Sequence, residues 1–275
     1  MSFSQHLLSV QRQHNSLLCV GLDVDPGRLP APLKTLPDGI GEFVRRIVDA
    51  TKDLVCAYKP NLAFYEALGR NGWEILRKTL DSIPKDIVTI GDGKRGDIGN
   101  TSARYAAALF DDLGFDAITV NPYMGSDSVE PFLRNPDRGA FILALTSNTG
   151  SRDFQRLKSG GVPLYEKVVR AARKWNSNQN VGLVVGATHT SELRRVRALA
   201  PDMPFLIPGI GTQGGDLKAS IQWGCTTDGP LAVINVSRSI LYASSGADFA
   251  DAARAEAMRL RNDMNALRQQ LLREK

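Results

Sequence analysis

Residues 87–121 have the sequence IVTIGDGKRGDIGNTSARYAAALFDDLGFDAITVN, and this stretch decides the fold. An apolar run at 87–92 is followed by a stretch with helical spacing at 101–113, and then by a second apolar run at 117–121. Two apolar runs joined by a helix predict a βαβ unit with parallel strands. Both runs are continuous instead of alternating, which is expected for strands that are buried on both faces.

The same alternation of strand and helix extends along the rest of the chain. The predicted strands are 17–23, 54–59, 87–92, 117–121, 140–145, 181–185, 205–207 and 231–236. The predicted helices are 41–52, 66–82, 101–113, 129–133, 164–175, 191–200, 216–223 and 247–273. Eight such units predict an α/β protein built as a (β/α)8 TIM barrel with parallel strands. Because no linker interrupts the series, we expect residues 1–275 to form one domain, with an N-terminal helix at 2–14 and a long C-terminal helix at 247–273.

Composition narrows the classes of partner. The chain has 34 basic and 29 acidic residues, a formal net charge of +5, which favours anionic partners such as small phosphorylated substrates. The basic residues are scattered among acids and aromatics make up 7%, so we expect no nucleic-acid partner. No apolar run approaches the roughly 18 residues of a membrane span, and the three cysteines show no disulfide or zinc spacing. We therefore expect a cytoplasmic protein without a membrane partner.

Charged side chains follow the first three predicted strands, where barrel proteins carry their reactive groups. These residues are Asp23, Lys59, Asp92 and Lys94, with Asp97 in the loop that follows. Asp92 and Lys94 are two positions apart at a strand end, so they are expected to point to the same face. A lysine held cationic by carboxylates can stabilise and protonate a carbanion, whereas a Schiff-base lysine needs a lowered pKa. The flanking aspartates favour the first role over the second.

Glycine-rich and polar loops follow the later strands. The segment from Pro208 to Asp216 and the one from Asn235 to Ser239 correspond to the common phosphate site of barrels, where Arg238 adds a forked cation. The spacing of Gly209, Gly211 and Gly214 also matches a dinucleotide fingerprint, but that motif normally opens a doubly wound sheet and here follows six βα units. Residues 146–151 after the fifth strand can either bind the edge of a polar heterocycle or form a plain turn.

Together these segments carry a family resemblance. The pattern Asp92-x-Lys94-x-x-Asp97-Ile98-x-Asn100-Thr101 resembles the signature of the orotidine 5'-phosphate decarboxylase family. The resemblance continues in family order through Gly21-Leu22-Asp23, Tyr58-Lys59-Pro60-Asn61, Pro208 to Asp216 and Ser237-Arg238-Ser239. The chain length and the segment Asn121 to Gly125 are similar to the longer sequence type of that family.

The resemblance implies a reaction and catalytic residues. The expected fold is a (β/α)8 barrel, and the expected reaction converts orotidine 5'-monophosphate (OMP) to UMP and CO2 in de novo pyrimidine nucleotide biosynthesis, without metal or organic cofactor. Lys94 is implied as the proton donor to C6 of the pyrimidine. Asp92 is implied to lie against the substrate carboxylate, with Lys59 and Asp97 completing the charged network.

It also implies substrate contacts and an assembly. Asp23 is expected at the ribose and Ser147 at the pyrimidine, with Ser151 as the alternative to Ser147. The phosphate loops supply the remaining expected contacts, which are Pro208, Gly211, Gln213, Ser237 and Arg238. Family members are typically homodimers whose sites are completed across the interface, so Asp97 and Thr101 are expected to reach the site of the neighbouring subunit.

Two positions depart from the family pattern, and three other functions stay open. Arg95 stands where many relatives carry an aromatic residue, and Gly99 stands where they carry proline. Sugar-phosphate decarboxylases and aldolases of the same superfamily share a DxKxxD-like core but need a divalent ion. An NADP-binding protein would rest on the glycine loop and Arg238. A catalytically silent barrel would bind UMP without turnover.

Overall fold

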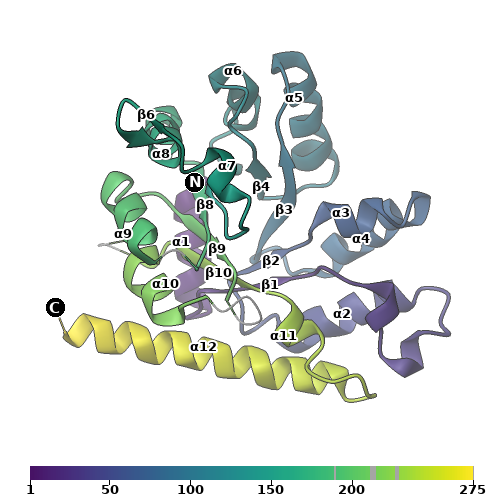
Figure 1. The fold of residues 1–275 in the computed structure, drawn as a ribbon. Coiled ribbons are helices and arrows are strands. Elements are labelled where there is room, and N and C mark those ends of the chain that lie inside the picture. Colours follow the sequence, from purple (N-terminus) through teal and green to yellow (C-terminus); the bar gives the residue numbers. More distant parts are fainter. Residues whose placement is uncertain (189, 211–214, 227–228, 275) are drawn as a thin grey trace.

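Eight parallel strands close into a barrel in the computed structural model, which describes residues 1–188, 190–210, 215–226 and 229–274 (Figure 1). The strand order around the barrel is β1-β10-β9-β8-β5-β4-β3-β2. The strands are β1 Leu18–Gly21, β2 Ala57–Lys59, β3 Val88–Arg95, β4 Ala117–Val120, β5 Gly139–Leu145, β8 Val181–Val185, β9 Phe205–Pro208 and β10 Ala232–Val236. The predicted (β/α)8 barrel is confirmed, and each predicted strand overlaps an observed one.

Helices surround the barrel. The longer ones are α1 Phe3–Gln13, α2 Gly39–Thr51, α4 Arg70–Ser82, α5 Gly99–Ala106, α8 Leu164–Trp175, α9 Thr190–Leu199, α10 Leu217–Gly224 and α12 Phe249–Arg273. Shorter elements are α3 Leu62–Glu66, α6 Ser126–Val129, α7 Ser151–Phe154, α11 Arg238–Leu241 and the two-stranded hairpin of β6 Lys158–Ser159 with β7 Val162–Pro163. Single 3-10 turns lie at Pro26–Arg28, Ala31–Leu33 and Glu130–Phe132, and a π-helical turn at Ala107–Asp112 continues α5.

One predicted helix is wrong as a single element. The helical pattern at 66–82 is divided between α3 and α4, because Gly69 between them has a φ of +64°, a conformation that ends a right-handed helix. The predicted helix at 129–133 is likewise the end of α6 followed by a 3-10 turn. Elements of two to four residues, such as α7 and α11, are too short to show a periodic pattern in the sequence.

The core has an inner and an outer layer. On β4, Ala117 belongs to the cluster inside the barrel, whereas Ile118 and Val120 belong to the cluster between the barrel and its helices. Successive side chains of a strand point to opposite faces, so each strand contributes to both layers. This burial on both faces explains the continuous apolar runs of the sequence.

The helix α1 closes the amino-terminal end of the barrel. Phe3, Leu7 and Val10 join the inner cluster, and the ring of Phe3 meets that of Phe141 edge-on with centroids 5.8 Å apart. Gln11 Nε2 donates a hydrogen bond to the backbone oxygen of Ala232 at the start of β10 (2.7 Å). Figure 1 shows α1 behind the strands at the centre of the barrel.

The longest described helix, α12, lies along one side of the barrel next to α2, α10 and α11 (Figure 1). Its first residue, Phe249, stacks on Phe43 of α2 with ring centroids 5.1 Å apart, and Arg254 pairs with Asp53 at 2.7 Å.

In the described part of the chain, no helix combines the length and the apolar character that crossing a bilayer requires.

We expect replacement of Phe3 by alanine to lower the free energy of unfolding by about 3–5 kcal/mol, because the fully buried ring leaves a cavity that the strands cannot fill. Urea unfolding followed by circular dichroism measures this loss. Ser9→Ala, at an exposed position of the same helix, is the matched control and should leave stability nearly unchanged. Equal effects of the two substitutions would contradict a sealing role for α1.

Candidate active site

A cavity of about 250 Å³ opens at the carboxyl ends of the strands. It gathers eight of the residues that the sequence singled out, which are Asp23, Lys59, Asp92, Lys94, Ser147, Pro208, Ser237 and Arg238. Other polar side chains also line it, of which Asn61, Thr146, Asn148, Asn235 and Ser239 belong to segments that the sequence assigns to the site, whereas Thr119 does not. The barrel therefore brings strand ends that are distant in sequence to one place, as its topology requires.

Lys59 lies at the centre of the charged cluster. Its side chain is almost fully buried at the end of β2, and Nζ donates to Asp92 Oδ2 at 2.9 Å and lies 3.7 Å from Asp23 Oδ1. Burial alone lowers the pKa of a lysine, but the Asp23 and Asp92 carboxylates outweigh it and hold the pKa of Lys59 above its usual range. Lys59 is therefore a permanent buried cation.

Asp92 accepts hydrogen bonds on both of its carboxylate oxygens. Lys94 Nζ (2.7 Å) and Thr119 Oγ1 (2.9 Å) donate to Oδ1, and Lys59 Nζ donates to Oδ2. Burial raises the pKa of this carboxyl, but the two lysines overcome that effect and hold the pKa of Asp92 well below its usual range. Asp92 is thus an anion of fixed orientation.

Lys94 is placed by an unusual backbone conformation. Its φ is +47°, a left-handed value that is uncommon for a residue with a side chain, and its side chain is about half exposed toward the cavity. The next residue, Arg95, pairs with Glu66 and lies over the ring of Tyr105, 5.3 Å from its centroid. Glu66 of α3 and Tyr105 of α5 thereby hold this arginine, which stands where many relatives carry an aromatic residue.

The sequence predicts that Asp92 and Lys94 point to the same face, and the hydrogen bond between their side chains confirms this.

Asp23 is held by residues at the end of β10, the strand that pairs with β1 on the side away from β2. Ser237 Oγ donates to its Oδ2 at 3.0 Å, and Asn235 Nδ2 donates to Ser237 Oγ at 3.4 Å. Gly21 makes this approach possible, because a Cβ at that position would lie 1.9 Å from Ser237 Oγ. Ser237, expected from the sequence at the phosphate, here contacts the carboxylate of Asp23.

The other predicted residues have different positions. Asp97 and Thr101, at the start of α5, are outside the cavity lining. Ser147 lines the cavity, whereas Ser151 is buried at the start of α7 and does not. Arg238 is exposed at the mouth. Gly211 and Gln213 lie outside the described residues.

One polar residue of the cavity, Thr119, lies in no segment that the sequence assigns to the site. Thr119 and Asn235 each interrupt an apolar strand, in the runs AITV and AVINV, and both point inward. A polar residue in a strand that is otherwise buried on both faces needs a hydrogen-bond partner. The interruption of an apolar strand is the sequence signal that points to Thr119.

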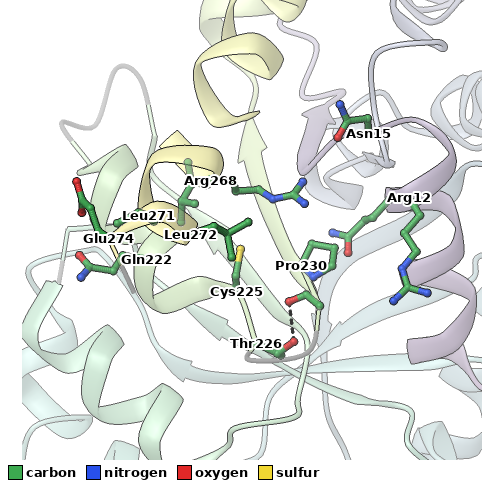
Figure 2. A pocket seen from close by; sticks show the side chains of 13 residues that line it. Arg12, Asn15, Gln222, Cys225, Thr226, Pro230, Arg268, Leu271, Leu272 and Glu274 are labelled. Atoms are coloured by element: carbon green, nitrogen blue, oxygen red, sulfur yellow. Dashed lines mark hydrogen bonds between the residues drawn. The ribbon is translucent and has the colours of Figure 1, made fainter. Parts of the chain in front are cut away.

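A larger hollow of about 570 Å³ lies at the other end of the barrel, between α1, α10 and α12 (Figure 2). Arg12 and Arg268 line it together with Cys225, Leu271 and Leu272. It contains none of the residues that the sequence singled out for chemistry, so the charged cavity, although smaller, is the candidate active site.

Fold and site together define a barrel protein whose strand ends hold a buried lysine between carboxylates and present a second lysine to the cavity. A family model described as "Orotidine 5'-phosphate decarboxylase / HUMPS family" matches residues 16–253. The chain belongs to this family, and curated relatives at about 50% identity are named orotidine 5'-phosphate decarboxylase, which places the chain among the decarboxylases, a class of carbon–carbon lyase.

Individual relatives match over nearly the whole chain. Orotidine 5'-phosphate decarboxylase of Dehalococcoides mccartyi is 52% identical over 272 residues, which make up 98% of this chain and 99% of that protein. The structure of Leishmania donovani OMP decarboxylase matches with a TM-score of 0.85 and 43% identity, over 98% of this chain and 99% of that one. Leishmania donovani UMP synthase matches with a TM-score of 0.87 and 45% identity, over 98% of this chain but 57% of the synthase.

The lowered pKa of Asp92 predicts how stability depends on pH. The unfolded carboxyl, with a pKa of about 3.9, binds a proton more readily than the folded one, so acidification from pH 7 to pH 3 favours unfolding by about 1 kcal/mol through this group. Asp92→Asn lacks this contribution. Its unfolding free energy, measured by urea titration, should fall less than that of the wild type between these two pH values, and an identical fall would refute the assignment.

Proposed function

We propose that this protein decarboxylates OMP to UMP and CO2 in pyrimidine nucleotide biosynthesis, by protonation from a lysine and without metal or organic cofactor. The observation that carries the proposal is the contact of Lys94 with Asp92, 2.7 Å apart at the cavity, with Lys59 behind it. The family membership and the named relatives support the substrate.

Decarboxylation places negative charge on C6 of the pyrimidine, and a cation next to C6 stabilises that charge. As the bond from C6 to the carboxylate carbon breaks, its electron pair stays on C6 as a vinylic carbanion, which resonance stabilises poorly. The ammonium of Lys94 stabilises this charge and gives a proton to C6, after which the neutral amine regains a proton from water. The carboxylate of Asp92 accepts a hydrogen bond from the Lys94 ammonium and so holds it in place.

Asp92 and Lys59 provide the charged frame of the reaction. Asp92 is ionised in the free site, and it would lie against the departing carboxylate, whose repulsion is relieved as CO2 forms. Lys59 contacts both Asp92 and Asp23, and together with Lys94 it balances their two negative charges. Two carboxylates balanced by two ammonium groups need no divalent cation to be stable, which supports a reaction without metal.

The rest of the cavity would bind the nucleotide. Arg238 at the mouth is suited to the phosphate, with Pro208 beside it and with Gly211 and Gln213 assigned by the family resemblance. Ser147 would contact the pyrimidine, and Asp23 the ribose. Binding of the remote phosphate would contribute to catalysis by holding C6 against Lys94.

We also propose a homodimer in which each site is completed by the other subunit. Asp97 and Thr101 lie outside the cavity of their own subunit, although the family resemblance assigns both to the site. Ile98 between them is 56% exposed, and Tyr123 and Met124 after β4 are also exposed, so apolar surface surrounds these residues. A second copy that covers this surface would bring Asp97 to the partner's Lys94.

Turnover of OMP by the purified protein in excess chelator tests the function. The wild type should consume OMP and release UMP, and Lys94→Ala should lose at least about 10³-fold in kcat because the proton donor is gone. Lys78→Ala, which removes a lysine of α4 paired with Asp38 and Glu74 outside the cavity, is the control and should retain activity. Loss of turnover on chelation would favour the metal-dependent relatives, and binding of UMP without turnover would indicate a silent barrel.

Mixed dimers test the shared site. Lys94→Ala and Asp97→Ala should each be nearly inactive alone. If subunits exchange after mixing, half of the dimers are heterodimers, and each heterodimer holds one site with both native residues, so activity should recover to about a quarter of the wild-type value. The measurement is OMP turnover before and after the two variants are unfolded and refolded together. No recovery would refute a site built from two subunits.

A further inference from the structure

Thr119 occupies an unusual position beneath the reacting groups. It lies on the inner face of β4, is 1% exposed, and lines the cavity together with Asp92 and Lys94. Its hydroxyl accepts a hydrogen bond from the backbone N–H of Lys94 (2.9 Å) and donates one to Asp92 Oδ1 (2.9 Å). Because a hydroxyl has a single proton and the amide can only donate, the direction of both bonds is determined.

The backbone of β3 explains why this hydroxyl is needed. Along the β3–β4 ladder, Gly91 pairs with Ile118 and Arg95 pairs with Val120, so four residue steps on β3 correspond to two on β4. The intervening residues bulge out of the ladder, and Lys94 in the bulge has a φ of +47°. A left-handed residue with a side chain costs about 1–2 kcal/mol, so the conformation persists only where its surroundings hold it.

We propose that Thr119 is a positioning residue for the decarboxylation, whose hydroxyl holds the backbone of the proton donor Lys94 and the carboxylate of Asp92 in one fixed arrangement. This inference rests on the proposed function. Asp92 Oδ1 receives Thr119 Oγ1 and Lys94 Nζ together, so one side chain connects both ends of Lys94 to the same carboxylate. Without the hydroxyl, the bulge loses the partner of an amide and Asp92 loses one of its three donors.

Thr119→Val removes the hydroxyl while preserving the shape of the side chain. We expect kcat for OMP to fall by about 10- to 100-fold, because small displacements of reacting groups have effects of this size. KM for OMP and Kd for UMP should stay within about threefold of the wild type, since Thr119 touches neither the phosphate nor the base in this proposal. Thr119→Ser restores the hydroxyl and should recover kcat to within about threefold.

The chain offers a matched control at the other end of β3. Thr89 Oγ1 donates to Asp116 Oδ2 (2.8 Å) and accepts from the backbone N–H of Asp116 (3.1 Å), the same pair of bonds outside the cavity lining. Thr89→Val should lower the melting temperature and leave kcat unchanged. Equal losses of kcat in Thr89→Val and Thr119→Val would show that Thr119 acts through stability alone and would overturn the inference.

The remaining outcomes separate this inference from the function itself. A wild type that turns over OMP, with Thr119→Val equally active or Thr119→Ser as impaired as Thr119→Val, overturns the positioning role only. A wild type without turnover overturns the proposed function and the positioning role with it. If Thr119→Val does not fold, Thr119→Ala replaces it, with the same kcat and KM readouts and the melting temperature as the check on folding.

Discussion

The burial of one ammonium group is the constraint on which the site depends. Lys59 is almost without contact with water, and a buried cation is stable only when it is paired. Asp23 and Asp92 neutralise it from two neighbouring strands, and each is in turn held by a hydroxyl, that of Ser237 for Asp23 and that of Thr119 for Asp92. The charged side chains therefore form one connected network, in which the loss of Lys59 leaves two carboxylates without their shared cation.

The barrel provides the rigidity that this network needs. The charged groups lie at strand ends, where the ladder fixes the backbone, and the irregular part of β3 is the exception. There the chain departs from regular pairing in order to turn Lys94 into the cavity. The backbone is therefore regular where the buried charges pair and irregular in β3, where Lys94 turns toward the cavity. The irregular part of β3 is held by the hydrogen bond between the Lys94 amide and the Thr119 side chain in place of a ladder hydrogen bond.

Much of this arrangement could be predicted from the sequence. Apolar runs with glycine or polar ends locate all eight strands, and the spacing of Asp92 and Lys94 predicts that they meet. The bulge could not be predicted, because it depends on the pairing of β3 with β4, which is a tertiary property. The break at Gly69 is local, but a glycine within a helical pattern does not by itself reveal a positive φ. Thr119 is a lone polar residue in an apolar strand, and only its contacts with Asp92 and Lys94 show its role.

The closing helix α1 has a consequence for biosynthesis of the chain. It precedes every strand, yet the backbone of Phe3 bonds to that of Pro136, and Gln11 bonds to Ala232, 221 positions later. Strand β1 must also wait for β10 before the ring can close. Contacts of such sequence separation form slowly, so on the ribosome the apolar stripe of α1 remains uncovered until nearly all of the barrel has emerged. During that interval α1 is a segment that chaperones can recognise.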